Sequence, residues 1–417
     1  MSKLYVEGNK SLNGNVIISG SKNAALPILF MSILTEEKVK ISNVPNLTDI
    51  NIALKLLIYL GVKIKYNKIL YIDASSINIF YAPYHLIKKI RASIWILGPL
   101  LARFGKAKIF LPGGCKIGNR PVDLHLNGLI KLGATITLKN NCIDAYVKGR
   151  LQGKYIFMKR ISVGATITIM SAATLAEGFT IIDNAAREPE IVDIAKFLNT
   201  LGANIIGAGS NKIYIKGVIK LNGGTHKIIP DRIETGTFLV AAAASQGLIT
   251  CHETEPKHLN SILMKLTEAG AKIKTGKDWI QLDMRGKRPK SLHIHTSPYP
   301  GFPTDMQAQF ALLNSISEGI GTITETIFDN RFIYTSELIN MGAKIKVQNN
   351  NTIICHGIPK LTSSNVFCSD LRASATLILA GCIAVGLTIV HRTYHLIRGY
   401  ELFPDKLNQL GADIKII

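Results

Sequence analysis

The 417-residue chain lacks the cysteine and histidine patterns that mark metal sites and disulfide frameworks. Its six cysteines, at positions 115, 142, 251, 355, 368 and 382, form no C-x-x-C pair and show no regular spacing with histidine. Zinc sites and disulfide-rich secreted domains both depend on such spacing. We therefore expect no metal, no disulfide framework and a reducing cytoplasm around the protein.

Long hydrophobic runs are also absent. The longest stretches without a charged residue or histidine are 18 residues from Ala373 to Val390 and 17 residues from Thr235 to Cys251, and both contain glycine and hydroxyl side chains. A membrane helix needs about 20 predominantly apolar residues. Since the first 16 residues hold no apolar stretch of signal-peptide length either, we expect a cytoplasmic protein with no membrane partner.

Acidic and aromatic residues are both few. The chain has 28 Asp and Glu against 49 Lys and Arg, a net charge of +21, and only 7% aromatic residues. A positive surplus attracts nucleic acids, membranes and small anions alike, and in a Lys-rich composition part of it has no function. No nucleic-acid-binding motif accompanies the charge, so a basic nucleic-acid-binding protein is the weaker alternative, and a steep loss of affinity with salt would reveal it. Walker A, GxGxxG, HExxH and GxSxG motifs are missing too.

A short glycine-centred sequence recurs six times along the chain. Its glycines are followed by valine or alanine and stand at positions 61, 133, 202, 270, 342 and 411, at intervals of 72, 69, 68, 72 and 69 residues. Alternating apolar and polar residues follow, which predicts a strand, so the glycine is expected to end an amphipathic helix. The chain therefore contains six repeats of about 70 residues.

Each repeat also has one segment that is almost free of charge. These segments are 23–34, 92–102, 163–176, 235–245, 306–317 and 373–384, and glycine at 105, 178, 247, 319 or 386 is expected to end five of them. A helix that is apolar all round is buried on all sides, so we predict an α/β fold with sheets packed around internal helices. Six repeats exceed one such core, which favours two domains of three repeats with a break between Gly223 and Pro230.

Charged residues gather at the starts of the apolar segments: Lys22, Arg91, Asp231 with Arg232, Asp305, and Asp370 with Arg372. A cation at a helix N-terminus is unfavourable unless an anion binds there. A solvated or ion-paired end residue explains any one of them, but the recurrence favours a shared anionic ligand. Four more arginines, Arg120, Arg187, Arg331 and Arg398, follow predicted strands and are expected at one edge of the repeats.

The loop from Leu111 to Pro121 has three glycines and two prolines in eleven positions around Cys115. Lys116 and Arg120 would favour its thiolate, so Cys115 is a candidate acid or nucleophile. The other five cysteines are expected to be buried and inert, and His125 is expected to be structural.

Nine segments of this sequence match one known family. They are GSKNAALP at 20–27, RASIW at 91–95, LPGGC at 111–115, RPVDL at 120–124, SVGAT at 162–166, AREPE at 186–190, PDRIETG at 230–236, PTDMQAQ at 303–309 and DLRAS at 370–374. Over essentially its full length the chain resembles the UDP-N-acetylglucosamine 1-carboxyvinyltransferases of bacteria. The resemblance implies a two-domain inside-out α/β barrel, with residues 22–229 as one domain, residues 1–21 plus 230–417 as the other, and substrates in the cleft between them.

The resemblance also implies the chemistry. The family transfers the enolpyruvyl group of phosphoenolpyruvate to the 3-hydroxyl of UDP-N-acetylglucosamine (UDP-GlcNAc) and releases phosphate, in the first committed step of peptidoglycan synthesis. The reaction passes through a tetrahedral intermediate without a metal or organic cofactor, and we expect a monomer with no nucleic-acid partner. Related synthases that make 5-enolpyruvylshikimate-3-phosphate (EPSP) are the enzyme alternative, but they lack the PGGC loop.

Site residues follow by motif from the same resemblance. Cys115 would donate the proton and be alkylated by fosfomycin, and Asp305, with a pKa depressed by arginines, would orient the hydroxyl as well as act as base. Lys22 and Arg398 complete the catalytic set. Phosphoenolpyruvate would contact Lys22, Asn23, Arg120, Arg331, Arg372 and Arg398. UDP-GlcNAc would contact Asn23, Arg91, Arg120, Pro121, Val122, Asp123, Leu124, Arg160, Ile161, Ser162, Val163, Asp305 and Ile327.

Three departures from the family pattern stand out. Thr48 and Arg160 replace lysines that many members carry, and residues 348–352 form a surface turn that is one residue longer than usual. Arginine keeps the charge of lysine but changes the geometry of donation. We expect none of the three to abolish activity.

Overall fold

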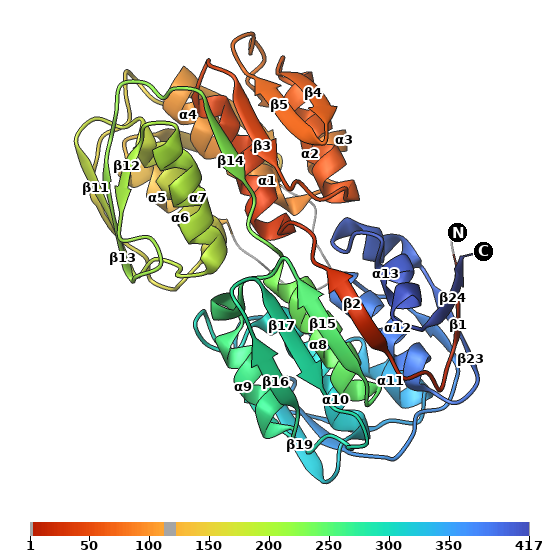
Figure 1. The fold of residues 1–417 in the computed structure, drawn as a ribbon. Coiled ribbons are helices and arrows are strands. Elements are labelled where there is room, and N and C mark those ends of the chain that lie inside the picture. The colour runs from red at the N-terminus through yellow and green to blue at the C-terminus, as the bar shows by residue number, and fades with distance from the viewer. Residues whose placement is uncertain (1–2, 112–121, 417) are drawn as a thin grey trace. The chain divides into compact units, whose positions relative to one another are not determined.

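The structure is a computed structural model that describes residues 3–111 and 122–416. The chain divides into two compact units (Figure 1). One is formed by residues 20–229, without 112–121, and the other by residues 3–19 together with 230–416. The resemblance implies a first domain boundary between residues 21 and 22, which is two residues later than in the structure. It implies a second boundary between residues 229 and 230, where the structure also divides the chain.

Every complete repeat runs in the same order: a buried helix, a strand, a second helix, a β-hairpin and a short final strand. In the 20–229 unit these elements are α1 (Lys22–Met31), η1 (Ser32–Leu34), β3 (Val39–Ser42), α2 (Thr48–Tyr59), β4 (Lys63–Asn67), β5 (Ile69–Asp73) and β6 (Tyr81–Ala82); α3 (Tyr84–Ile87), η2 (Arg91–Ile96), α4 (Leu97–Phe104), β7 (Lys106–Phe110), α5 (Asp123–Lys131), β8 (Thr135–Lys139), β9 (Cys142–Tyr146) and β10 (Tyr155–Phe157); α6 (Val163–Thr174), β11 (Phe179–Asp183), α7 (Pro189–Thr200), β12 (Asn204–Ile206), β13 (Lys212–Lys216) and β14 (Gly224–Lys227).

The second unit repeats this order. Its elements are α8 (Arg232–Ala244), β15 (Leu248–His252), η3 (Pro256–His258), α9 (Asn260–Glu268), β16 (Lys272–Thr275), β17 (Trp279–Asp283) and β18 (His293–His295); η4 (Thr304–Met306), α10 (Gln307–Ile316), β19 (Ile320–Thr324), α11 (Thr335–Asn340), β20 (Lys344–Gln348), β21 (Thr352–His356) and β22 (Asn365–Phe367); α12 (Leu371–Ile383), β23 (Leu387–His391), η5 (Thr393–Arg398), α13 (Phe403–Gln409) and β24 (Asp413–Ile416).

Six four-stranded sheets result within the described residues, and all share one topology. Their orders are β14-β3-β5-β4, β6-β7-β9-β8, β10-β11-β13-β12, β2-β15-β17-β16, β18-β19-β21-β20 and β22-β23-β1-β24. In each sheet the first pair is parallel and the others are antiparallel. The parallel edge strand comes from the end of another repeat, so each repeat is tied to a neighbour through a sheet.

The N-terminal segment completes the sixth repeat. β1 (Leu4–Glu7) pairs antiparallel with both β23 and β24, where the return strand of a hairpin lies in the other repeats. β2 (Asn13–Ile17) supplies the parallel edge strand of the fourth repeat beside β15. The sixth repeat is therefore assembled from both ends of the chain.

The six glycine-centred sequences are confirmed as helix stops. At Gly61, φ is 104°, its N–H donates to the carbonyl of Ile58, and the N–H of Val62 donates to the carbonyl of Leu57. This is the Schellman motif, which needs a left-handed residue that glycine adopts without a Cβ clash. The same two bonds recur at Gly133, Gly202, Gly270, Gly342 and Gly411, where φ lies between 89° and 101°.

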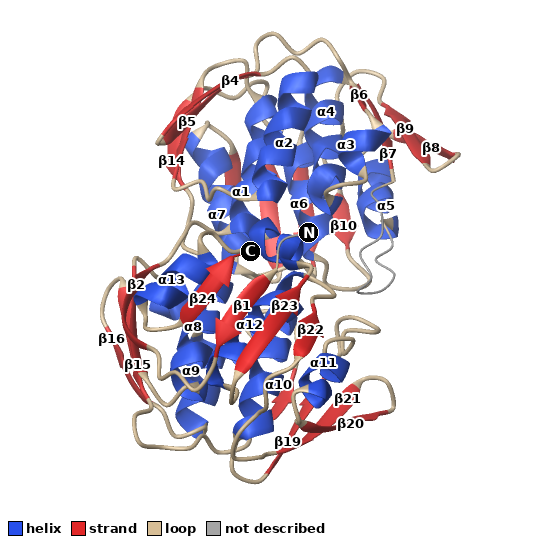
Figure 2. Ribbon diagram, turned by 90° about the vertical axis from the view of Figure 1, so that its right-hand side faces the viewer, coloured by secondary structure: helices blue, strands red, loops and turns tan. Residues whose placement is uncertain are grey.

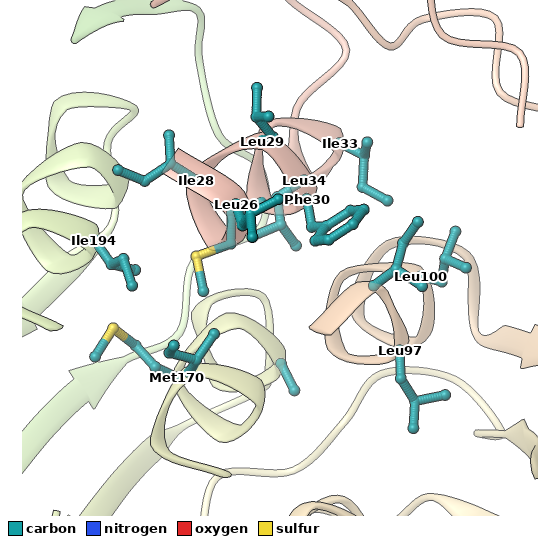
Figure 3. Close-up of a cluster of buried hydrophobic side chains, with 14 of the residues drawn as sticks. Leu26, Ile28, Leu29, Phe30, Ile33, Leu34, Leu97, Leu100, Met170 and Ile194 are labelled. Carbon is teal, nitrogen blue, oxygen red and sulfur yellow. The ribbon is translucent and has the colours of Figure 1, made fainter. Parts of the chain in front are cut away.

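Three of the six apolar helices form the centre of each unit, as predicted (Figure 2). In the 20–229 unit, side chains of α1, η1, α4, α6 and α7 meet in one apolar cluster that includes Phe30, Leu97 and Met170 (Figure 3). All thirteen residues of α8 are buried in the other unit. No helix in the described part of the chain is long and apolar enough to cross a membrane.

The prediction that glycine ends five of these helices is wrong except at one position. Gly105, with φ 72°, is the C-cap of α4. The other four glycines each lie immediately before the following strand, two residues or more after the helix has ended. Gly247 shows why glycine is needed there, because a Cβ would lie 1.9 Å from the carbonyl oxygen of Leu12.

A buried ion pair fixes the end of the N-terminal segment in the second unit. The Glu234 carboxylate accepts hydrogen bonds from Lys406 Nζ at 2.6 Å and from the Ser19 N–H at 3.0 Å. Burial outweighs the attraction of Lys406 and raises the pKa of Glu234 from 4.5 to about 7. A carboxylate with a raised pKa is more stable protonated in the folded state.

Stability should therefore fall as pH rises from 4.5 to 7. Below pH 4.5 Glu234 is protonated in both states, and between the two values only the folded state keeps the proton. The difference amounts to about 3 kcal/mol at most. Urea unfolding at several pH values should show this slope in the wild type and its loss in Glu234→Gln. An identical slope in both proteins would contradict the assignment.

Candidate active site

Asp305 lies between two buried arginines in the second unit. Its Oδ1 accepts a hydrogen bond from Arg331 Nη2 at 2.6 Å, and its Oδ2 accepts one from Arg372 Nη2 at 2.9 Å. Asp305 belongs to η4, Arg331 follows β19, and Arg372 is in the first turn of α12. The side chains of both arginines are only 7% exposed, whereas that of Asp305 is 29% exposed. The structure thus brings three predicted site residues into one cluster.

The two guanidinium groups set the charge of Asp305. Burial favours the neutral acid, but Arg372 and Arg331 more than offset it and hold the pKa of Asp305 well below its usual value. The same contact raises the pKa of Arg372, although burial opposes this. One carboxylate between two guanidinium groups leaves a net positive charge. The cluster can therefore attract an anion, while its carboxylate can accept a hydrogen bond from a substrate hydroxyl.

Each arginine also has a donor to spare. Arg331 Nη1 and Arg372 Nη1 are buried without a hydrogen-bond partner among the described residues. The guanidinium groups lie over the rings of Phe328 and Tyr400, both at 5.3 Å, which fixes their planes. Buried donors without partners are costly unless a ligand uses them.

In the 20–229 unit, Lys22 is the first residue of α1 and lies 3.4 Å from the carboxylate of Asp49. Asn23 is the next residue of this helix. Asp49 is buried in the first turn of α2, directly after Thr48, which begins that helix. Asp49 carries no functional signal in the sequence, because only the packing of α1 on α2 pairs it with Lys22.

A second group of predicted residues meets where α5 and α6 begin. Asp123, the first residue of α5, accepts a hydrogen bond from Arg160 Nη2 at 2.6 Å. Ser162 caps α6 by accepting from the Ala165 N–H at 3.2 Å. Leu124 follows Asp123 on α5, Val122 is its N-cap, and Ile161 and Val163 flank Ser162. Both side chains of the Asp123–Arg160 pair are about half exposed, so they are open to a ligand.

His125 supports this group from the interior. Its Nδ1 lies 2.8 Å from Thr168 Oγ1, and burial, with Arg91 adding to the effect and Asp123 opposing it, lowers the pKa of His125 to about 4. The imidazole is therefore neutral near pH 7, as expected of a structural histidine. A Cβ on Gly164 would lie 2.9 Å from the ring, so glycine lets α6 approach it.

The remaining predicted residues are placed as follows. Arg91 begins η2, Arg398 ends η5 rather than lying in a loop, and Ile327 is half-buried in the segment after β19. Cys115, Arg120 and Pro121 lie outside the described residues. Arg187 donates from its Nε to the Gly209 carbonyl at 3.3 Å within the 20–229 unit. In the described ranges no three histidine, cysteine or acidic side chains gather as metal ligands do.

The five described cysteines are free thiols. Burial raises the pKa of Cys355 and Cys382 to about 12 and that of Cys368 to about 11. It raises the pKa of Cys251 further still. The prediction of burial is wrong for Cys142, which is only half-buried. It begins β9, directly after the turn at 140–141 of the β8–β9 hairpin.

Comparison with known proteins gives the family. A family model described as EPSP synthase (3-phosphoshikimate 1-carboxyvinyltransferase) matches residues 6–407. Two relatives named UDP-N-acetylglucosamine 1-carboxyvinyltransferase come from Buchnera aphidicola subsp. Acyrthosiphon pisum (strain APS), 85% identical with both chains fully covered, and Pectobacterium carotovorum subsp. carotovorum (strain PC1), 61% identical over 100% of this chain and 99% of that one.

Solved structures agree at the level of the fold. The enolpyruvyl transferase NikO from Streptomyces tendae has a TM-score of 0.91 at 24% identity, covering 100% of this chain and 98% of that one. An EPSP synthase from Acinetobacter baumannii has a TM-score of 0.77 at 18% identity with both chains fully covered. The matching family model and the full-length relatives show that the chain belongs to the EPSP synthase family and, within it, to the UDP-N-acetylglucosamine 1-carboxyvinyltransferases.

Proposed function

We propose that this protein transfers the enolpyruvyl group of phosphoenolpyruvate to the 3-hydroxyl of UDP-GlcNAc and releases inorganic phosphate. The observation that carries the proposal is the 85% identity, over both full chains, to relatives named for this reaction. The product would enter peptidoglycan synthesis in the cytoplasm. We further propose that the protein acts as a monomer and uses no metal or organic cofactor.

The Asp305 cluster supports a role in both substrate binding and the first chemical step. Arg331 and Arg372 would bind the carboxylate of phosphoenolpyruvate, and Asp305 would hold the 3-hydroxyl of the sugar. Because the pKa of Asp305 is held so low, its main contribution is to orient the hydroxyl and stabilise its developing positive charge, rather than to store the proton.

The reaction then proceeds by addition and elimination. The 3-oxygen bonds to C2 of phosphoenolpyruvate as the hydroxyl proton passes through the Asp305 carboxylate to solvent, while C3 accepts a proton that Cys115 would donate. The tetrahedral intermediate then returns a proton from C3 to the Cys115 thiolate as the C2–O bond to phosphate breaks, which restores the double bond. Lys22, Arg120 and Arg398 would compensate the charge of the departing phosphate.

The other anionic substrate suits the group around α5 and α6. Residues 120–124 and 160–163, with Asn23, Arg91 and Ile327, would bind UDP-GlcNAc. The N-terminus of α6 offers backbone N–H groups to a phosphate, and Arg160 adds a guanidinium beside it. An enzyme of the EPSP synthase type is the alternative, because the matching family model carries the name of that enzyme. The substrate requirement separates the two.

A phosphate-release assay with each substrate alone and with both tests the proposal. Release is expected only when phosphoenolpyruvate and UDP-GlcNAc are both present, and fosfomycin should abolish it. Mass spectrometry should find the fosfomycin adduct in Cys142→Ser, whose half-exposed thiol is removed, and not in Cys115→Ser. Release with shikimate 3-phosphate in place of UDP-GlcNAc, or none with any pair, would overturn the proposal.

A further inference from the structure

Glu325 is a buried acid that directly follows β19 and accepts five hydrogen bonds. It is 3% exposed. Oε1 accepts from Thr296 Oγ1 at 2.9 Å and from the N–H groups of Ile327 and Phe328 at 2.8 and 3.2 Å. Oε2 accepts from Thr304 Oγ1 at 2.7 Å and from Gln307 Nε2 at 3.2 Å. One carboxylate thus joins the end of β18, the start of η4 and α10, and the segment after β19.

Comparison of the repeats sets Glu325 apart. In four other repeats the residue at this position, directly after the strand that follows the buried helix, has left-handed backbone angles with φ between 52° and 59°. These residues are Asn43, Asn184, Glu253 and Arg392. In all five repeats the carbonyl just before it accepts an N–H from the residue after the edge strand, so the positions are equivalent. Glu325 lies outside the left-handed region and turns its carboxylate onto its own loop instead.

The two oxygens of Glu325 hold two different parts of the candidate site. Thr304 and Gln307, which bind Oε2, flank Asp305 in the chain, and Tyr334 donates from its hydroxyl to Gln307 Oε1. On the other side, the N–H groups bound to Oε1 belong to the segment that carries Ile327. Phe328 in that segment lies under the guanidinium of Arg331.

We propose that Glu325 is a positioning residue for the transfer reaction, which sets Asp305 through Oε2 and the segment 327–328 through Oε1. The inference rests on the function proposed above. Misplacing a reacting group by about 1 Å can lower turnover by about a hundredfold, so we expect the contacts of Oε1 and those of Oε2 to have separate kinetic effects. Loss of a contact to Oε2 should lower kcat, and loss of a contact to Oε1 should raise the KM for UDP-GlcNAc.

Two matched threonine variants separate positioning from simple stability. Thr304→Val and Thr296→Val each remove one hydroxyl bond to the same carboxylate. Thr296 is 1% exposed and also accepts from the Thr326 N–H at 2.9 Å, so its loss should lower Tm more. Thr304→Val should nevertheless lower kcat more, by about tenfold, with the KM for UDP-GlcNAc changed less than about threefold. Thr296→Val should raise that KM and leave kcat within about twofold.

Among the variants of this hydrogen-bond group, Glu325→Gln gives the largest expected effect. The amide nitrogen cannot face two backbone N–H groups, so it takes the side of Thr304 and Gln307. There the Thr304 hydroxyl has to turn and accept instead of donate, and the bond from Gln307 Nε2 is lost because two donors face each other. We expect a fall in kcat of about tenfold to a hundredfold, while Glu318→Gln, exposed near the other end of β19, keeps wild-type kinetics. If the threonine variant with the lower Tm also had the lower kcat, the inference would be overturned. A wild-type kcat in Glu325→Gln would overturn it as well, and neither result would affect the proposed function. A wild-type protein without turnover would instead overturn the proposed function and this inference with it.

Discussion

Replacing Asp305 by asparagine should lower kcat for phosphate release by about a thousandfold or more, while the protein stays folded. Asparagine keeps the shape of the side chain but removes the charge that neutralises Arg331 and Arg372. Its amide nitrogen would face a guanidinium, so one of the bonds at 2.6 and 2.9 Å is lost. The variant also loses the acceptor that orients the sugar hydroxyl and stabilises its developing charge.

Measuring the rate at saturating concentrations of both substrates separates this loss of kcat from weaker substrate binding. The control is Asp283→Asn, which weakens a contact at 2.9 Å with the exposed Arg285 in the same unit and should keep wild-type kcat. Because the pKa of Asp305 lies well below its usual value, its titration should not shape the wild-type rate between about pH 5 and 8. A kcat within tenfold of the wild type in Asp305→Asn would contradict the role of this carboxylate.

The elements that the sequence predicts well are those set by nearby residues. The glycine at position 61 and its five counterparts end helices because a left-handed residue is needed there, and only a few neighbouring residues decide this. The apolar helices were also found, since an uncharged segment of helical length has to be buried. The turn at 349–351 lies between β20 and β21 as expected, with Asn349 and Asn350 at positive φ.

The contacts that the sequence does not predict join distant segments. Arg331 and Arg372 are 26 and 67 residues from Asp305, and their residue types suggest anion binding without showing that they meet. Glu325 gave no signal, because an acid after a strand normally lies on the surface and only the burial around it reveals its bonds. The short edge strands, such as β6 with two residues, are too short for a pattern and take their place from the neighbouring repeat.

The position of the N-terminal segment leads to the second prediction with a large effect. A chain that begins at Ile18 lacks β1 and β2, and we expect its 230–416 part not to fold. β1 is an interior strand, and β24 has no other partner in its sheet. The deletion also removes four fully buried aliphatic side chains, Leu4, Val6, Leu12 and Val16. At about 1.5 to 3 kcal/mol each, their loss alone is comparable with the whole stability of a domain, which is about 5 to 15 kcal/mol.

Thermal unfolding followed by circular dichroism can test this, because the 20–229 unit contains none of the deleted residues. The shortened chain should keep one cooperative transition with roughly half of the wild-type helical signal, and it should bind a hydrophobic dye. A synthetic peptide of residues 1–19 added in trans should restore the missing signal, since the strands pair through backbone hydrogen bonds that need no covalent link. A chain that begins at Lys3 keeps both strands and should unfold like the wild type. If the chain that begins at Ile18 retained the full signal, the sixth repeat would not depend on β1, and its assembly from the two ends of the chain would be dispensable for folding.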